Sequence, residues 1–144
     1  MNDNFTIKTA TADDAAIILN FIKELADYEK LSHEVVATEA MLQENLFGEN
    51  SPSEVHIAYY NNEPIGYTMF FRSFSTFLGV PGIYLEDLYI TPKMRGQGFG
   101  KKLLTNVARL VKEKGYGRLE WSVLDWNKPA IDFYESIGAI PFVP

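Results

Sequence analysis

The stretch Ile83–Lys102, IYLEDLYITPKMRGQGFGKK, decides how the rest of the chain is interpreted. Its opening part, Ile83–Ile90, is rich in branched and aromatic residues, which predicts a β-strand. Thr91-Pro92 ends that strand, because proline cannot donate to a hydrogen-bonded ladder. Over Gly98–Lys114 apolar residues recur on one face, which predicts a helix that Gly115 closes. The stretch is therefore a strand, a turn and the start of a helix.

The turn carries three glycines at alternate positions, Gly96, Gly98 and Gly100, directly after Arg95. Glycines let backbone N–H groups converge, and a helix N-terminus favours an anion through its dipole. The pattern predicts a pyrophosphate cradle. It is not a Walker A loop, because Lys102 stands where Ser or Thr is needed, and its glycine spacing differs from the dinucleotide fingerprint. The alternative is a glycine-rich turn that only caps a core helix.

Composition and charge narrow the class of function. The chain has 144 residues with 47% hydrophobic residues, which suits one domain over 1–144. It has no cysteine and only His33 and His56 as imidazoles, so we expect no metal site and no cysteine nucleophile. The net charge of −6 disfavours nucleic acid and anionic membranes as partners and mildly favours cationic ligands. Without a signal peptide or an apolar run of ~20 residues, a cytoplasmic protein is expected.

The remaining elements alternate between strands and helices. The expected strands are Phe5–Ala10, Val55–Tyr60, Ile65–Arg72, Leu119–Leu124 and Ala139–Val143. A first helix is expected to begin after a capping box of Thr11 and Asp14 and to end in Ala26–Glu29. A second helix is expected from a Thr38 cap to Gly48 as its C′ residue, and a short last helix over Pro129–Ile137. Asn61–Pro64 is a hairpin-type turn, and Phe74–Gly82 is expected to be a loop. The order β-α-α-β-β-β-α-β-α-β predicts an α/β domain with a mixed sheet.

The cradle resembles a known family element. Arg95-x-x-Gly98-x-Gly100 is similar to the R/Q-x-x-G-x-G/A sequence that holds the coenzyme A pyrophosphate in the GCN5-related N-acetyltransferases (GNAT superfamily). Glu24–Leu31, Tyr84–Asp87 and Trp126–Tyr134 resemble the diamine acetyltransferase branch, which includes spermidine/spermine and thialysine acetyltransferases. The resemblance covers nearly the whole chain in the right order. It implies the GNAT fold, a mixed central sheet flanked by helices.

The resemblance also implies acetyl-CoA as the co-substrate. Pantetheine would pair like an added strand with the backbone of Leu88, Tyr89 and Ile90. An N–H near Tyr89 or Ile90 would polarise the thioester carbonyl. Asn127 would hydrogen-bond pantetheine and begin the last helix, and Ala130 stands where relatives often have Ser. The implied cofactor-binding set is Leu88, Tyr89, Ile90, Arg95, Gly96, Gln97, Gly98, Phe99, Gly100, Lys101, Lys102, Asn127, Ala130 and Tyr134.

Two residues match catalytic positions of the family. Glu86 would hold the cationic acceptor and receive its proton through water, because an alkylamine with a pKa near 10 arrives protonated. Tyr134 would protonate the leaving thiolate. Strand alternation places Asp87 on the face opposite Glu86. The implied acceptor-binding set is Tyr28, Glu29, Glu86, Asp87 and Trp121. The alternatives are a solvated strand charge for Glu86, a core aromatic for Tyr134, and a polar helix end for Tyr28 and Glu29.

The C-terminus departs from the family pattern. Relatives continue past Ser136–Ala139 with a loop carrying acidic and Trp residues and then a final strand, whereas this sequence stops at Pro144. A missing strand would leave an unpaired sheet edge. Either a second subunit covers that edge, the edge is tolerated, or the sequence is truncated, and the expectation is a homodimer.

The combined interpretation is direct transfer of acetyl from acetyl-CoA to a primary amine of a small cationic acceptor, a polyamine, a diamine or a lysine-like amino acid. The second interpretation is acetylation of a protein N-terminus, a lysine side chain or an aminoglycoside. A third is a truncated, non-catalytic domain that binds acyl-CoA. Glu86 and Tyr134 favour the enzyme, and the short tail favours the binding domain.

Overall fold

The computed structural model describes residues 4–124 and 126–140. Its sheet has the order β1-β2-β3-β4-β5, with antiparallel neighbours except for the parallel pair β4–β5. The strands are β1 Phe5–Thr9, β2 Ser53–Tyr60, β3 Glu63–Ser75, β4 Val80–Ile90 and β5 Leu119–Trp121; the helices are α1 Ala15–Tyr28, α2 Glu39–Phe47, α3 Phe99–Glu113 and α4 Lys128–Ser136. The prediction of an α/β fold with a mixed sheet is confirmed.

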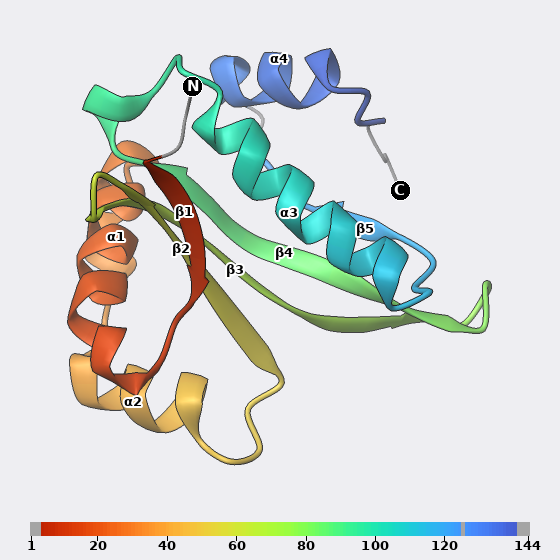
Figure 1. The fold of residues 1–144 in the computed structure, drawn as a ribbon, viewed down its shortest axis with the longest axis horizontal. Coiled ribbons are helices and arrows are strands. Elements are labelled where there is room, and N and C mark those ends of the chain that lie inside the picture. The colour runs from red at the N-terminus through yellow and green to blue at the C-terminus, as the bar shows by residue number, and fades with distance from the viewer. Residues whose placement is uncertain (1–3, 125, 141–144) are drawn as a thin grey trace.

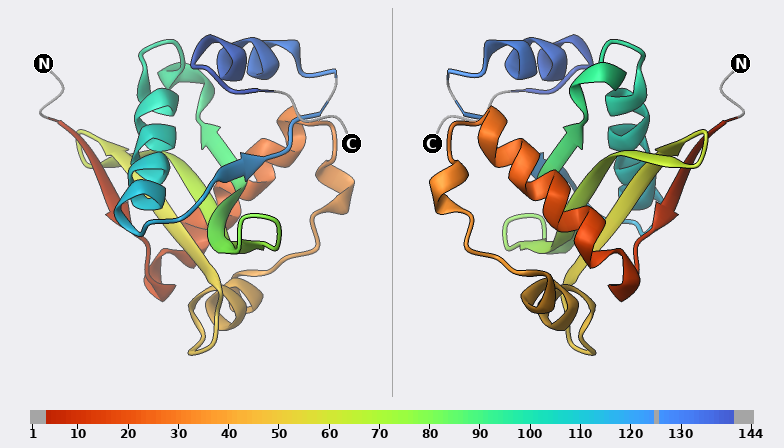
Figure 2. Two further views of the ribbon diagram at one scale, coloured as in Figure 1. Left: turned by 90° about the vertical axis from the view of Figure 1, so that its right-hand side faces the viewer. Right: turned by 90° about the vertical axis from the view of Figure 1, so that its left-hand side faces the viewer.

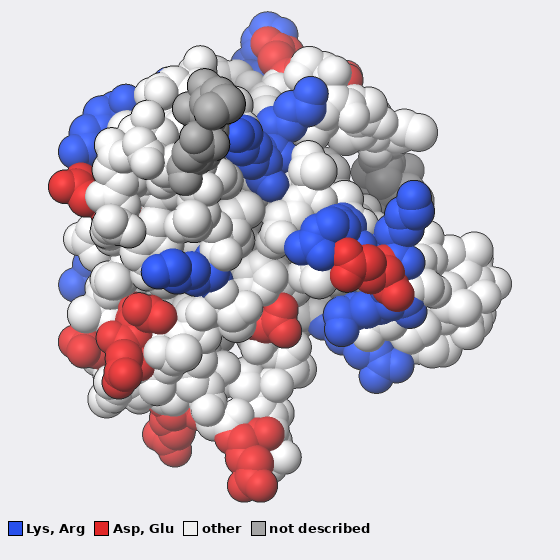
Figure 3. Space-filling model, viewed as in Figure 1, with Lys and Arg blue, Asp and Glu red and all other residues white. Residues whose placement is uncertain are grey.

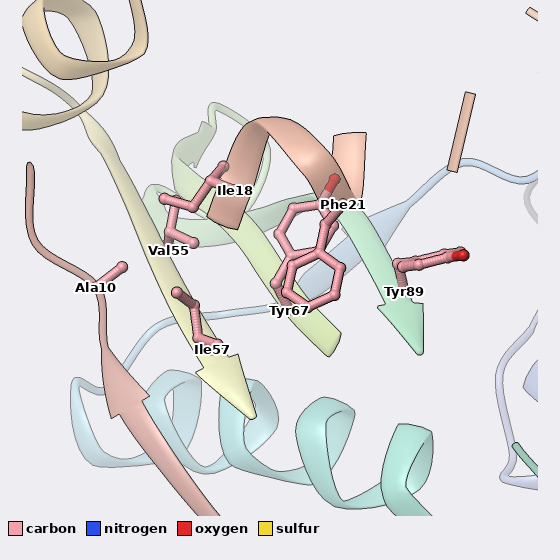
Figure 4. Close-up of a cluster of buried hydrophobic side chains, with 7 residues drawn as sticks. All are labelled: Ala10, Ile18, Phe21, Val55, Ile57, Tyr67 and Tyr89. Atoms are coloured by element: carbon pink, nitrogen blue, oxygen red, sulfur yellow. The ribbon is translucent and has the colours of Figure 1, made fainter. Parts of the chain in front are cut away.

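Helices cover both faces of this sheet. Figures 1 and 2 show α1 and α2 on one face and α3 on the other, with α4 near the start of α3. Under α1, Phe21 stacks on Tyr67 of β3 with ring centroids 5.5 Å apart, within the cluster drawn in Figure 4. Under α3, Leu104 and Val107 pack against Leu85 of β4. Burial on both faces explains why β4 reads as an almost continuous apolar strand.

β4 changes direction in its middle. Met69 of β3 pairs with Asp87 while the next residue, Phe70, pairs with Leu85, so Glu86 is the extra residue of a β-bulge. β5 pairs with β4 only from Ile83 to Leu85. Beyond the bulge, no strand of the described residues lies on the β5 side of β4. The two parallel strands therefore separate, and the gap is where the candidate site lies.

Several local predictions need correction. The expected loop Phe74–Gly82 is wrong, because β3 extends to Ser75 and β4 begins at Val80, with only residues 76–79 as the turn. Main-chain hydrogen bonds between β3 and β4 hold this hairpin, and in its turn the Ser75 hydroxyl accepts from the Leu78 N–H (3.1 Å). The expected strand Leu119–Leu124 ends at Trp121, where its neighbour has already turned away at the bulge.

The helix ends were predicted with mixed success. The Asp14 carboxylate accepts from the Thr11 N–H (2.9 Å), as a capping acid should, although a 3-10 turn precedes α1. Gly48 ends α2 in an extended conformation (φ −68°) and is not a left-handed C′ residue. For the expected strand Ala139–Val143, residues 139–140 are not in a strand and residues 141–143 lie outside the described residues.

Candidate active site

A cleft of about 840 Å³ opens where β4 and β5 separate. Its walls come from the end of α1, the second half of β4, the turn before α3, β5 and α4. Every residue of the predicted cofactor and acceptor sets lines it except Gln97 and Lys102. Lys102 cannot offer its main-chain N–H as predicted, because that group donates to the Gly98 carbonyl (3.1 Å), and its ammonium lies over the Phe5 ring.

The glycine turn forms one end of the cleft. Gly96 and Gly98 have φ of +80° and +85°, and a Cβ at either would meet no atom within 4 Å. Left-handed backbone, and not crowding, therefore calls for glycine there. Gly98 is the N-cap of α3, and the N–H groups of Phe99, Gly100 and Lys101 precede the first intrahelical bond. These features fit an anion, as expected for the pyrophosphate cradle.

Arg95 turns into the cleft. Its Nε donates to the Ile90 carbonyl (2.8 Å), and its guanidinium lies over the rings of Tyr28 (4.9 Å) and Tyr89 (5.3 Å). The Tyr89 hydroxyl in turn donates to Glu24 of α1 (2.9 Å). Arg95 therefore fastens the glycine turn to the end of β4 and to α1. The Figure 3 view shows several Lys and Arg over α3 with acidic residues among them, and mostly Asp and Glu near α2.

Another part of the cleft is acidic, because Glu29, Glu86 and Asp87 are in its lining and the charges of Glu29 and Glu86 act on Asp87. The prediction that Asp87 lies on the face opposite Glu86 is wrong. Leu85 packs under α3, whereas Asp87 accepts from the Tyr67 hydroxyl (2.8 Å) in the cluster under α1. Strand alternation is thus broken at the bulge, and both acids face the same cleft.

Burial raises the pKa of Asp87 to about 6; the hydrogen bond from Tyr67 opposes this rise, while the negative charges of Glu86 and Glu29 add to it. Burial also raises the pKa of Glu29. Carboxyl groups that gain from neutralisation are suited to bind a cation, because a positive charge relieves both desolvation and mutual repulsion. The acidic end therefore has the electrostatics of an amine-binding site.

Tyr134 stands on α4 between Trp121 and Phe133, with ring centroids 5.0 and 5.4 Å away. Burial raises its pKa to about 12, with a further contribution from the negative charge of Glu29. Asn127 is buried at the start of α4, and its side-chain oxygen accepts from the Tyr28 hydroxyl (3.0 Å) and the Ala130 N–H (3.4 Å). The prediction that Asn127 begins this helix is confirmed.

The comparisons with known proteins agree with this geometry. The acetyltransferase (GNAT) family model matches residues 21–139. The chain belongs to this family. The thialysine N-epsilon-acetyltransferase of Caenorhabditis elegans is 40% identical over 137 residues, which cover 95% of this chain and 84% of that protein. The L-ornithine N5-acetyltransferase NATA1 of Arabidopsis thaliana is 32% identical, over 94% of this chain and 79% of that protein. These relatives place this GNAT member in the diamine acetyltransferase-like branch, and it is an acetyltransferase enzyme.

A solved structure confirms the GNAT fold. An aminoglycoside acetyltransferase from an uncultured soil metagenomic sample superposes with a TM-score of 0.84 at 21% identity, covering 99% of this chain and 94% of that one. GNAT acetyltransferases use acetyl-CoA, and the residues present suit it: a glycine turn at a helix N-terminus for the pyrophosphate, and an unpaired strand edge for pantetheine.

Some residues of the GNAT cleft were missed. Tyr67 holds Asp87, and the aromatic ring of Phe133 supports Tyr134 and lines the cleft. Tyr67 and Asp87 lie 20 residues apart on neighbouring strands and meet through a side-chain hydrogen bond, so no local sequence signal could have found Tyr67. In residues 4–124 and 126–140, no cluster of His, Asp and Glu could hold a metal ion. No helix in the same ranges is long and apolar enough to cross a membrane.

Proposed function

We propose that this enzyme transfers acetyl from acetyl-CoA to a primary amine of a small cationic acceptor, a polyamine, a diamine or a lysine-like amino acid, in a ternary complex without a covalent intermediate. One observation carries the proposal: a single cleft joins an anion-binding glycine turn to an acidic end lined by Glu29, Glu86 and Asp87. The names of the two relatives give thialysine and L-ornithine as acceptors, which supports a small amine.

The acidic end binds and deprotonates the acceptor. An alkylammonium with a pKa near 10 must lose a proton before its nitrogen can attack. Glu86, which is exposed at the bulge, holds the cation and receives that proton through water. Asp87, which shares its side of the strand, adds negative charge, and Tyr67 fixes the carboxyl group of Asp87. The loss of the cation's proton completes the preparation of the nucleophile.

The transfer step needs an electrophile and a proton donor. The amine nitrogen forms a bond to the thioester carbonyl carbon, and the carbon–sulfur bond then breaks. N–H groups at Tyr89 or Ile90, on the open edge of β4, stabilise the negative charge on the carbonyl oxygen. The departing sulfur takes the hydroxyl proton of Tyr134, which a pKa of about 12 keeps in place at neutral pH. Solvent then restores that proton.

The homodimer remains a proposal of its own. Its support is the family resemblance together with an apolar tip on the β3–β4 hairpin, where Phe74, Phe77 and Leu78 are exposed. Exposed apolar clusters of this kind are typical of contact surfaces. Light scattering of the purified chain would give the mass, and a stable monomer at micromolar concentration would contradict the dimer.

A thiol-release assay with acetyl-CoA and a panel of amines tests the function. The panel should contain polyamines, diamines, lysine-like amino acids, a peptide with a free N-terminus and an aminoglycoside. Release that depends on small diamines or diamino acids supports the proposal. Release only with the peptide or the aminoglycoside would refute the small acceptor, and binding of acetyl-CoA without any release would favour a non-catalytic binding domain.

A further inference from the structure

Lys30 has an unusual place at the end of α1. Its N–H donates to the Asp27 carbonyl (3.1 Å), and the next N–H, of Leu31, donates to Ala26 (2.8 Å). This is the Schellman arrangement that ends many helices, in which the C′ residue is left-handed and is usually glycine. Lys30 holds that position with φ of +62°, although its Cβ disfavours it. A lysine at a position where glycine is easier raises the question of a role for its side chain.

The Lys30 side chain reaches the entrance of the cleft. Its ammonium lies 4.9 Å from the ring centroid of Trp126, and that ring lies 6.3 Å from the ring of Tyr28, which lines the cleft. We call Tyr28, Lys30 and Trp126 the entrance cluster. Lys30 and Trp126 are solvent-exposed, and the ring of Tyr28 also carries the Arg95 guanidinium at 4.9 Å. At the entrance cluster, the Lys30 ammonium therefore lies over the Trp126 ring and the Arg95 guanidinium over the Tyr28 ring.

The two ends of the acceptor region have opposite charge. Glu29, Glu86 and Asp87 line the cleft, whereas Lys30 lies outside this lining, and Arg95 lines the cleft with its guanidinium over the Tyr28 ring of the entrance cluster. Among the described residues, neither the three acids nor the two cations form a salt bridge within 4.0 Å. A ligand with an ammonium group at one end and a carboxylate at the other would neutralise both ends. L-lysine brings its α-ammonium to the entrance together with a carboxylate, so that end of the acceptor is neutral overall, whereas a polyamine brings a positive charge there without a carboxylate.

We propose that Lys30 is the specificity residue that binds the carboxylate when the acceptor is an amino acid with a side-chain amine. This rests on the function proposed above and narrows its acceptor class. The side-chain amine enters the acidic interior, and the backbone carboxylate stays at the entrance cluster. The ring of Trp126 supports the Lys30 stem and holds the ammonium in place. Acceptors without a carboxylate lose this contact and meet the repulsion of the entrance.

The test compares two acceptors that differ by the carboxylate alone, L-lysine and 1,5-diaminopentane. Lys30→Gln keeps the Cβ and hence the backbone strain, but removes the charge. We expect it to raise KM for L-lysine roughly tenfold, the scale of one charged hydrogen bond, with kcat within about twofold. For 1,5-diaminopentane, KM should stay the same or fall. Lys30→Arg should restore most of the L-lysine affinity, and added salt should shrink the effect of the glutamine variant.

Lys23→Gln is the matched control, because it removes an exposed lysine from the same helix away from the entrance. It should change neither KM. The inference is overturned if Lys30→Gln affects both acceptors alike, affects neither, or raises only the KM for acetyl-CoA. Wild-type enzyme that prefers 1,5-diaminopentane would overturn it too, while leaving the proposed acetyl transfer intact. If no amine is acetylated, the proposed function fails instead, and calorimetry of both amines in the presence of coenzyme A decides the carboxylate question.

Discussion

At the scale of single residues, the Tyr134 hydroxyl decides whether the cleft is catalytic. Tyr134→Phe keeps the ring between Trp121 and Phe133, so packing should hardly change. If the hydroxyl protonates the thiolate, kcat should fall by roughly 10²–10⁴ while acetyl-CoA affinity is kept. Steady-state kinetics and calorimetry measure the two quantities. Tyr116→Phe removes a hydroxyl from a tyrosine that packs beside α3 and should leave kcat unchanged; full kcat in Tyr134→Phe would rule out the assigned acid.

Asp87 predicts how stability changes with pH. Its pKa is 3.8 when unperturbed and about 6 in the fold, so the folded state binds more protons between these values. Stability from this group is therefore full below about pH 4 and is lost as pH rises to about 6, by roughly 2–3 kcal/mol. Asp87→Asn should remove that loss. Urea midpoints from pH 4 to 7 would show it, and the exposed Asp13→Asn should keep the wild-type slope. An unchanged slope in Asp87→Asn would show that Asp87 titrates normally.

At the scale of elements, we expect acetyl-CoA binding at the start of α3 to depend on Gly98. Gly98→Asp places a Cβ on left-handed backbone, which destabilises the fold by about 1 kcal/mol. The substitution also adds a negative charge where the pyrophosphate is expected. Acetyl-CoA should then no longer raise the melting temperature. Gly79→Asp is a matched control, since Gly79 is also left-handed (φ +72°) and open but lies in the β3–β4 turn. Loss of the acetyl-CoA effect in both variants would point to general damage and not to the cradle.

Elements governed by local chemistry could be predicted from the sequence. The cap of α4 at Asn127, the glycine turn and the α3 helix depend on neighbours within a few residues, and each is found where expected. The bulge at Glu86 could not be predicted, because it exists only relative to the register of β3. For the same reason the pairing of Asp87 with Tyr67 was missed, and Asp87 was assigned to the wrong face. The sequence therefore predicted both acids as site residues, but it did not predict that they line the same cleft.

The hairpin from Phe74 to Gly82 shows a second kind of failure. Its glycines and proline are typical of a loop, yet Phe74 pairs with Pro81 and Ser75 with Val80. Once β3 and β4 are aligned by their buried central residues, main-chain hydrogen bonds continue the ladder, and the Ser75 hydroxyl accepts from the Leu78 N–H in the turn. Side-chain patterns therefore report the buried part of a strand and underestimate its exposed end. The same limit applies to the site, whose lining was predicted from family motifs more than from periodicity.

At the scale of the whole molecule, we expect acetyl-CoA to contact two parts of the fold and to stabilise the contact between them. One part is β1–β4 with α1 and α2, and the other is α3, β5 and α4, with β4 and β5 paired only over Ile83–Leu85. A ligand that spans the gap stabilises the fold by mass action, by about 2.7 kcal/mol at 100 times its Kd. For a chain of this size that is a rise in melting temperature of roughly 5–10 °C. An unchanged melting temperature at saturating acetyl-CoA would contradict the cleft as its binding site.

Hydrogen exchange locates the segments that acetyl-CoA contacts. Amides of Leu88–Ile90 that face the open edge of β4 should slow when acetyl-CoA binds, because pantetheine supplies acceptors that the sheet lacks there. Amides at the start of α3 and in α4 should slow as well, since both elements line the cleft. The outer helix α2 does not line it and should change little. Slowing spread evenly over the chain would indicate only general stabilisation, and slowing confined to α2 would place the ligand elsewhere. Protection along the β4 edge alone would show pantetheine pairing without the pyrophosphate cradle.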